Sequence, residues 1–181
     1  MSFYGIILIL HILAVMVSVG SATLVDYLHL VSLRKKKLEK GLVKIYPFVT
    51  KLINLSLLVI YLTGITLVYQ NTSILSNPLF ITKAFLVLVV TINGIYLQRS
   101  VSPHLDKCVI KGTKYCTPYV LKSSAIAGSI SIVTWYSIVI LSLSKTMNYS
   151  AKSFIISYLA VLVFATTTAY FVERKARKWR V

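Results

Sequence analysis

Residues 4–33 have the sequence YGIILILHILAVMVSVGSATLVDYLHLVSL, an apolar run in which Asp26 is the single formal charge. The run is longer than the roughly 20 residues that a helix needs to cross the hydrocarbon core of a bilayer. Four further apolar runs lie at 52–69, 79–98, 123–143 and 153–172. Because backbone polar groups in a bilayer must bond within their own segment, each run predicts a helix. The sequence therefore predicts an all-α fold, an integral membrane bundle of five transmembrane helices.

The overall composition agrees with this fold class. Of the 181 residues, 57% are hydrophobic and 13% are charged, and the mean hydropathy is +0.80. A soluble domain carries about a quarter of its residues as charges, so an ordinary soluble domain is excluded. No connection between the runs is long enough for a separate domain. The whole of 1–181 is predicted to form a single five-helix domain.

The basic residues show which way the chain crosses the membrane. All but three of the 20 lysines and arginines lie in alternate connections and the C-terminal tail, at 34–51, 98–122 and 173–181. The other three are Lys83, inside the third run, and Lys145 and Lys152, in the connection before the last run. Cytoplasmic connections of membrane proteins carry the excess of lysine and arginine. The pattern predicts an N-terminus outside and a C-terminus in the cytoplasm.

The distribution of basic residues in alternate connections also indicates which partners fit the net charge of +16. The basic connections are expected to lie against the anionic headgroups of the lipid bilayer. Basic residues interleaved with aromatic ones, as a single-stranded nucleic acid requires, are missing, so no nucleic acid partner is expected. Cys108 and Cys116 fall in a predicted cytoplasmic connection, where a structural disulfide is not expected.

Small residues predict where helices cross closely, because helix contacts in lipid favour them. The first run carries Ser18 and Ala22 four residues apart, and the fourth carries Ser124 and Gly128. Pro78 is expected in the first turn of the third helix, where its missing N–H costs nothing.

Acidic residues are too few for the common catalytic arrangements. The chain has four, which are Asp26, Glu39, Asp106 and Glu173. No two of them lie together in an apolar run, and no glycine-rich phosphate loop or nucleophile–base spacing is present. Whether the chain is an enzyme stays open at this point. Asp26 lies at a depth similar to that of Arg99, which predicts an ion pair between them.

Two ionisable residues inside the runs are the main candidates for a functional site, because burying such groups in a membrane is costly. His11 either makes a hydrogen bond between helices or binds a metal or haem. Lys83 either extends to the outer headgroups or faces inward. Both helices enter from outside, so the two residues are expected at similar depth and are predicted to face each other.

A second candidate site lies at the predicted inner surface. His29 is near the inner end of the first run, and His104 follows the third run. With Cys108 and Cys116 these side chains form a candidate metal site, although the spacing fits no recognised zinc pattern.

A series of residues in the first three runs resembles a known family. The series contains His11, Gly20, Thr63-Gly64, Lys83, Asn93-Gly94, Arg99, Pro103 and Leu105. It resembles the membrane domain of copper-resistance protein D and is similar, more distantly, to the membrane-bound haem-dependent protoporphyrinogen oxidases of bacteria. The resemblance covers about residues 7–105.

The resemblance implies that His11 is a ligand for haem b or copper, with Lys83 beside it, in redox or metal-handling work. It also implies a multi-pass protein of the cell membrane, the plasma membrane of a bacterium or archaeon. The alternative is a non-enzymatic scaffold, an assembly factor or a subunit of a larger membrane complex. In that case other membrane subunits are its partners.

Overall fold

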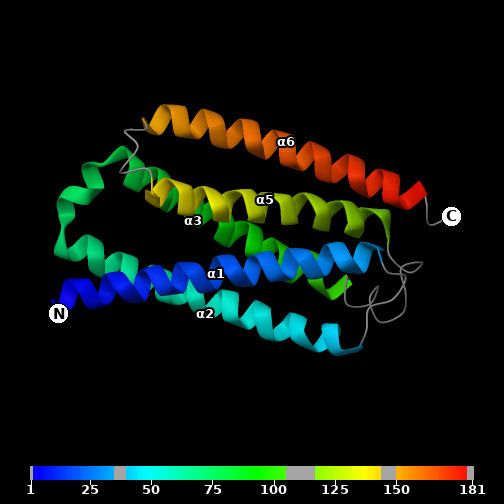
Figure 1. Cartoon of the computed structure of the whole chain (residues 1–181), viewed down its shortest axis with the longest axis horizontal. Coiled ribbons are helices and arrows are strands. Elements are labelled where there is room, and N and C mark those ends of the chain that lie inside the picture. Colours follow the sequence, from blue (N-terminus) through cyan, green and yellow to red (C-terminus); the bar gives the residue numbers. More distant parts are fainter. Residues whose placement is uncertain (1, 35–39, 105–116, 144–149, 179–181) are drawn as a thin grey trace.

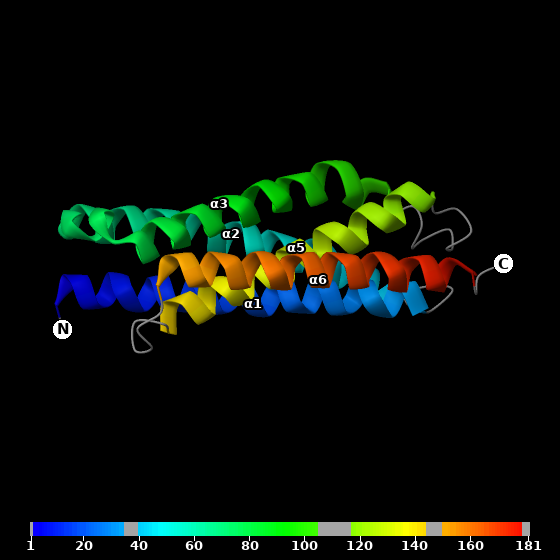
Figure 2. The same cartoon turned by 90° about the horizontal axis from the view of Figure 1, so that it is seen from above.

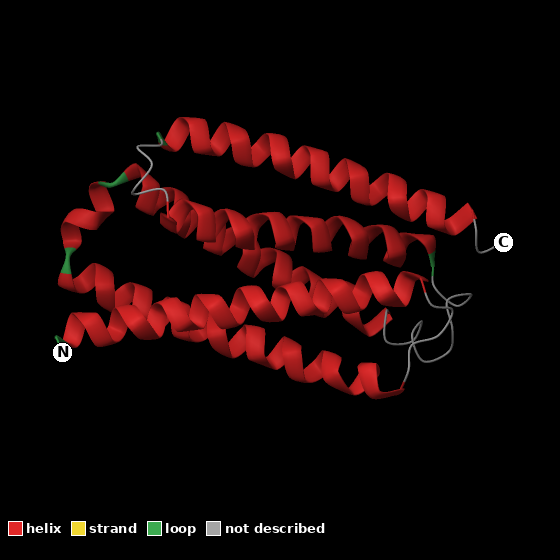
Figure 3. Cartoon of the chain, viewed as in Figure 1, coloured by secondary structure: helices red, strands yellow, loops and turns green. Residues whose placement is uncertain are grey.

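The computed structural model describes residues 2–34, 40–104, 117–143 and 150–178, and every regular element in them is helical (Figure 3). In chain order the elements are α1 (Phe3–Arg34), α2 (Lys40–Gln70), the 3-10 helix η1 (Thr72–Ser76), α3 (Pro78–Tyr96), the π-helix η2 (Leu97–Val101), α5 (Pro118–Leu143) and α6 (Ala151–Lys178). The described part of the chain contains no strand, as the all-α prediction requires.

Five helical segments are long and apolar enough to cross a membrane by length and composition. They are Phe3–Leu28, Ile45–Gln70, Pro78–His104, Pro118–Leu143 and Ala151–Lys175. Each contains most or all of one predicted run, so the number and the places of the apolar helices are confirmed. The chain has the helices of a multi-pass membrane protein.

The long helices lie side by side, with the N-terminus at one end of the bundle and the C-terminus at the other (Figure 1). Helix α1 packs mainly against α2, and α5 packs against α1, α3 and α6. Figure 2 shows α5 running obliquely through this arrangement, from the side of α1 toward the end of α3. Helix α5 therefore connects the packed pair α1 and α2 to α3 and α6.

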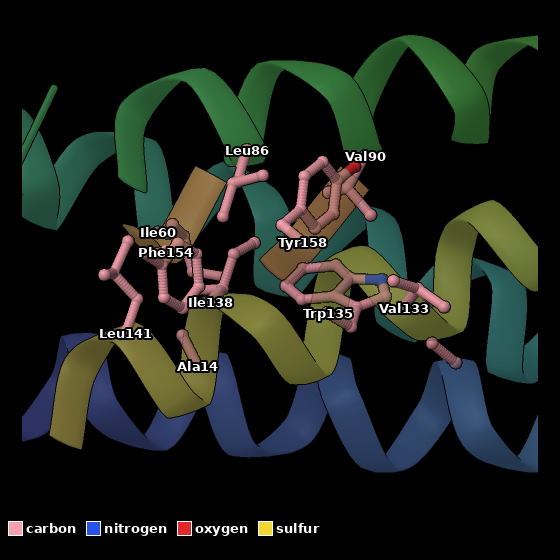
Figure 4. Packing of buried hydrophobic residues seen from close by; sticks show 11 residues of the cluster. Ala14, Ile60, Leu86, Val90, Val133, Trp135, Ile138, Leu141, Phe154 and Tyr158 are labelled. Carbon is pink, nitrogen blue, oxygen red and sulfur yellow. The ribbon is translucent and has the colours of Figure 1, made fainter. Parts of the chain in front are cut away.

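The packed interior is built around α5 (Figure 4). Trp135 and Leu141 of α5 are buried against Leu86 of α3, and Phe154 and Tyr158 reach them from α6. The hydroxyl groups of Thr134 and Tyr158, 3.1 Å apart, add a hydrogen bond between α5 and α6. Many large apolar side chains remain exposed on the outside of the bundle, a surface that suits a lipid environment.

The proline positions show how the helix ends form. Pro78 lies in the first turn of α3 as predicted, and Asn77 caps the helix by accepting a bond of 2.9 Å from the backbone N–H of Leu79. Pro47, by contrast, lies inside α2, so this helix begins well before the apolar run. At the far end of α3 the helix widens into the π-helix η2 before Pro103 is reached.

The small residues of α1 and α5 lie in the interior. Ser18, Ala22 and Ser124 are all buried. A Cβ atom added to Gly128 would lie 3.0 Å from Oδ1 of Asp26, which is tighter than an ordinary contact. This close approach of α1 to α5 supports the prediction from the small residues.

Candidate functional site

His11 is fixed to α2 by a side-chain hydrogen bond. Its Nδ1 lies 2.8 Å from Oγ1 of Thr63, on α2. The His11 side chain is partly buried and Thr63 is buried. The contact between α1 and α2 therefore holds the imidazole in one orientation.

The Thr63 hydroxyl determines which nitrogen of His11 carries the proton. Thr63 Oγ1 lies 2.6 Å from the carbonyl oxygen of Val59 and donates its single proton there, as threonines in helices commonly do. The same oxygen can then only accept from His11, so Nδ1 of the ring is the donor. In a neutral imidazole the proton on Nδ1 leaves a lone pair on Nε2. His11 thus has the form in which histidine binds metals.

Gly64 also borders the imidazole ring, at Cε1. A Cβ atom placed on Gly64 would lie 3.7 Å from Cε1 of His11, an ordinary van der Waals distance. The Thr63-Gly64 pair therefore supplies one hydrogen bond and one close surface to the same imidazole. An alanine at position 64 would touch the ring without displacing it.

Lys83 of α3 lies within electrostatic reach of His11. Its side chain is partly buried, and its charge acts on the His11 imidazole. The two residues belong to different helices, α1 and α3, and Thr63 on α2 is the third contributor. The structure thus joins α1 and α2 at the imidazole, and Lys83 acts on it from α3 through its charge.

Asp26 does not make the predicted ion pair with Arg99. Within the described ranges no basic group bonds the Asp26 carboxyl, and its Oδ2 is buried without a hydrogen-bond partner. Arg99 is exposed on η2, whereas Asp26 points toward Gly128 of α5. The prediction was wrong because similar depth places two residues at one level but does not place them on facing sides of their helices.

The second candidate metal site falls largely outside the described residues. This applies to Cys108 and Cys116 and to the side chain of His29. His104 is exposed, and its Nδ1 lies 3.2 Å from the carbonyl oxygen of Ser100 in the preceding turn. Nowhere in the described part of the chain do three histidine, cysteine or acidic side chains converge in a way that would hold a metal ion.

Polar contacts between helices were missed by the sequence analysis. The side-chain amides of Asn54 and Gln98 bond each other reciprocally, at 3.0 and 2.7 Å, and tie α2 to η2. Asn93 donates to the carbonyl oxygen of Ala127 at 2.8 Å and ties α3 to α5. An amide in an apolar run is the signal that predicts such contacts, since it must find a partner.

No protein-family model, curated protein or solved structure matches the chain.

Proposed function

We propose that this chain is a cell-membrane protein that binds haem b through Nε2 of His11, in the outer half of a five-helix bundle. The observation that carries the proposal is the hydrogen bond from His11 Nδ1 to Thr63. Histidines that bind metals commonly donate their second ring N–H to a fixed acceptor, which sets the tautomer and the ring orientation. Thr63 is such an acceptor.

The donor set favours haem over copper. One imidazole offers one bond, and a lone copper ion needs several nitrogen or sulfur ligands. Met16 is largely exposed, and the described residues supply no further ligand cluster near His11. Haem brings four nitrogens of its own and needs one axial ligand from the protein. His11 satisfies that requirement alone.

Lys83 offers a positive charge for the propionate groups of haem. The two propionates of the porphyrin are anionic, and an ammonium group near the axial ligand would pair with one of them. Bound haem would supply one-electron chemistry, whereas the chain would supply the ligand, the cation and an apolar surrounding. The resemblance to copper-resistance protein D and to the haem-dependent oxidases supports the same pair of residues.

The experiment is a purification in detergent from cells supplied with haem and with copper. The absorption spectrum should show a haem band, and metal analysis should find iron near one atom per chain and little copper. A colourless protein free of both metals would favour the alternative function, a non-enzymatic scaffold, assembly factor or membrane subunit.

The orientation is tested by cysteine labelling of intact cells. Cys108 and Cys116 should be inert to membrane-impermeant thiol reagents and become reactive after lysis, because their connection is predicted to be cytoplasmic. Cysteines introduced at Thr72 and Asn148, in a background without the native pair, should react in intact cells. Labelling of the native cysteines in sealed cells would reverse the orientation.

Thr63→Val tests the hydrogen bond that orients the ligand. Valine keeps the shape of threonine but leaves Nδ1 of His11 without its side-chain acceptor, and losses of about 10- to 100-fold in affinity are typical for such partners. Haem titration of the purified protein should show a weakening in that range. The matched control is Thr66→Val on the same helix, whose hydroxyl donates only to the carbonyl of Leu62. Equal affinities for both variants would exclude Thr63 as the orienting group.

A further inference from the structure

Asp26 is an acidic side chain in the bundle to which the proposed function gives no role. It lies eight residues before Arg34, the last residue of α1, which is about 12 Å along the helix axis. It also belongs to the segment Phe3–Leu28 that is apolar enough to cross a membrane. Its Oδ2 is buried and has no hydrogen-bond partner in the described part of the chain. The carboxyl group is therefore held where water does not reach one of its oxygens.

The surface that contacts this carboxyl belongs to α5. A Cβ atom on Gly128 would lie 3.0 Å from Oδ1 of Asp26, so the carboxyl rests directly on the α5 backbone. The two serines on either side of Gly128 already use their hydroxyl protons, since Ser124 donates to the Leu121 carbonyl and Ser129 to that of Ile126. Helix α5 thus offers the carboxyl a close surface, and neither of these serines stabilises a negative charge there.

The ionisable groups on the neighbouring helices do not offset a charge at Asp26 either. On α5, Lys122 lies 4.9 Å above the ring of Tyr170, and the Tyr136 hydroxyl lies 3.2 Å from that of Thr23. On α2, the candidates near this level are Tyr46, which is partly buried, and Lys51, which is exposed. None of these described side chains pairs with the Asp26 carboxyl, one oxygen of which is buried.

A carboxylate without a cation or donors is costly in such surroundings, whereas a neutral carboxylic acid is far cheaper. We propose that Asp26 is a proton-binding site, neutral while α1 and α5 are packed together. The proton comes from water, and the negative charge returns when α1 separates from Gly128 and water enters. Proton binding is thereby linked to the packing of these two helices. This inference does not depend on a cofactor at His11.

The chain allows a direct test because it has only two aspartates, Asp26 and Asp106. In the Asp106→Asn variant, cell-free synthesis with aspartate carrying ¹³C in its side-chain carboxyl labels Asp26 alone among the acidic side chains. Infrared spectra in detergent or lipid at about pH 6, where an exposed aspartate is ionised, should show the C=O stretch of a protonated acid, displaced by the label. That band should disappear on raising the pH. A labelled signal found only as carboxylate at about pH 6 overturns the proposal.

A second measurement addresses the link to packing. Between about pH 4 and neutral pH the folded state holds a proton that an exposed aspartate releases, so the parent protein should lose thermal stability as the pH rises through this range. Asp26→Asn replaces the neutral acid by a neutral amide of similar shape. It should melt as the parent does near pH 4 and show a weaker loss of stability as the pH rises to neutral. Glu173→Gln, at a buried acid on α6, is the matched control and should leave the labelled band in place. An unchanged pH dependence in Asp26→Asn would contradict the proposal.

Discussion

His11→Ala is expected to abolish haem binding, with complete loss of the haem absorption from the purified protein. The reason is that His11 supplies the single axial bond, and no other histidine in the described part of the chain lies near it. The replacement also removes the hydrogen bond to Thr63, a buried residue whose oxygen then keeps only its bonds to the backbone of α2. The measurement is the visible spectrum of the variant, normalised to protein and set beside iron analysis.

The controls separate ligation from a general loss of folding. His29→Ala should keep the spectrum, because His29 lies five helical turns away, about 27 Å along α1. Lys83→Met, which removes the ammonium and keeps an unbranched side chain one atom shorter, should weaken haem binding without abolishing it. An unchanged spectrum in His11→Ala would move the ligand to another residue. Loss of the spectrum in both histidine variants would point to unfolding.

The sequence predicts the fold well because a bilayer restricts the secondary structures that an apolar run can form. A run as apolar as 123–143 has to satisfy its backbone internally, and a helix is the only way to do so in a short chain. Local chemistry predicts Pro78 at the start of α3 in the same manner. These features depend on composition and on neighbouring residues, both of which are visible in one sequence.

The polar contacts between helices are harder to predict, because they depend on how each helix is rotated about its axis. The apolar runs carry no polar face that would reveal this rotation. Depth alone therefore suggested an ion pair between Asp26 and Arg99, whereas the structure turns Asp26 toward Gly128. The sequence places Thr63 in a motif. It does not show that Thr63 accepts a hydrogen bond from His11, because that bond depends on how α1 packs against α2.

Leu86→Ala is a core substitution with a large expected effect on stability. Leu86 of α3 is 1% exposed and lies in the cluster that α5 and α6 complete (Figure 4). Truncation of a buried leucine to alanine costs about 2–5 kcal/mol, because the neighbouring side chains only partly close the cavity. In a membrane the lost packing is the main part of this cost, since lipid chains are as apolar as leucine itself. Thermal or denaturant unfolding in detergent micelles should show the loss.

The chain offers a matched control two residues away. Leu88 lies on the same helix, is the same residue type and is 50% exposed, so its outer part would face lipid in either state. Leu88→Ala is expected to change the free energy of unfolding by about 0.5 kcal/mol or less, as substitutions away from packed sites usually do. The difference between the two variants isolates packing from helix propensity, because both replace leucine by alanine in α3. If Leu88→Ala were as damaging as Leu86→Ala, the exposed face of α3 would be covered in the native protein, and a partner subunit would be the natural occupant.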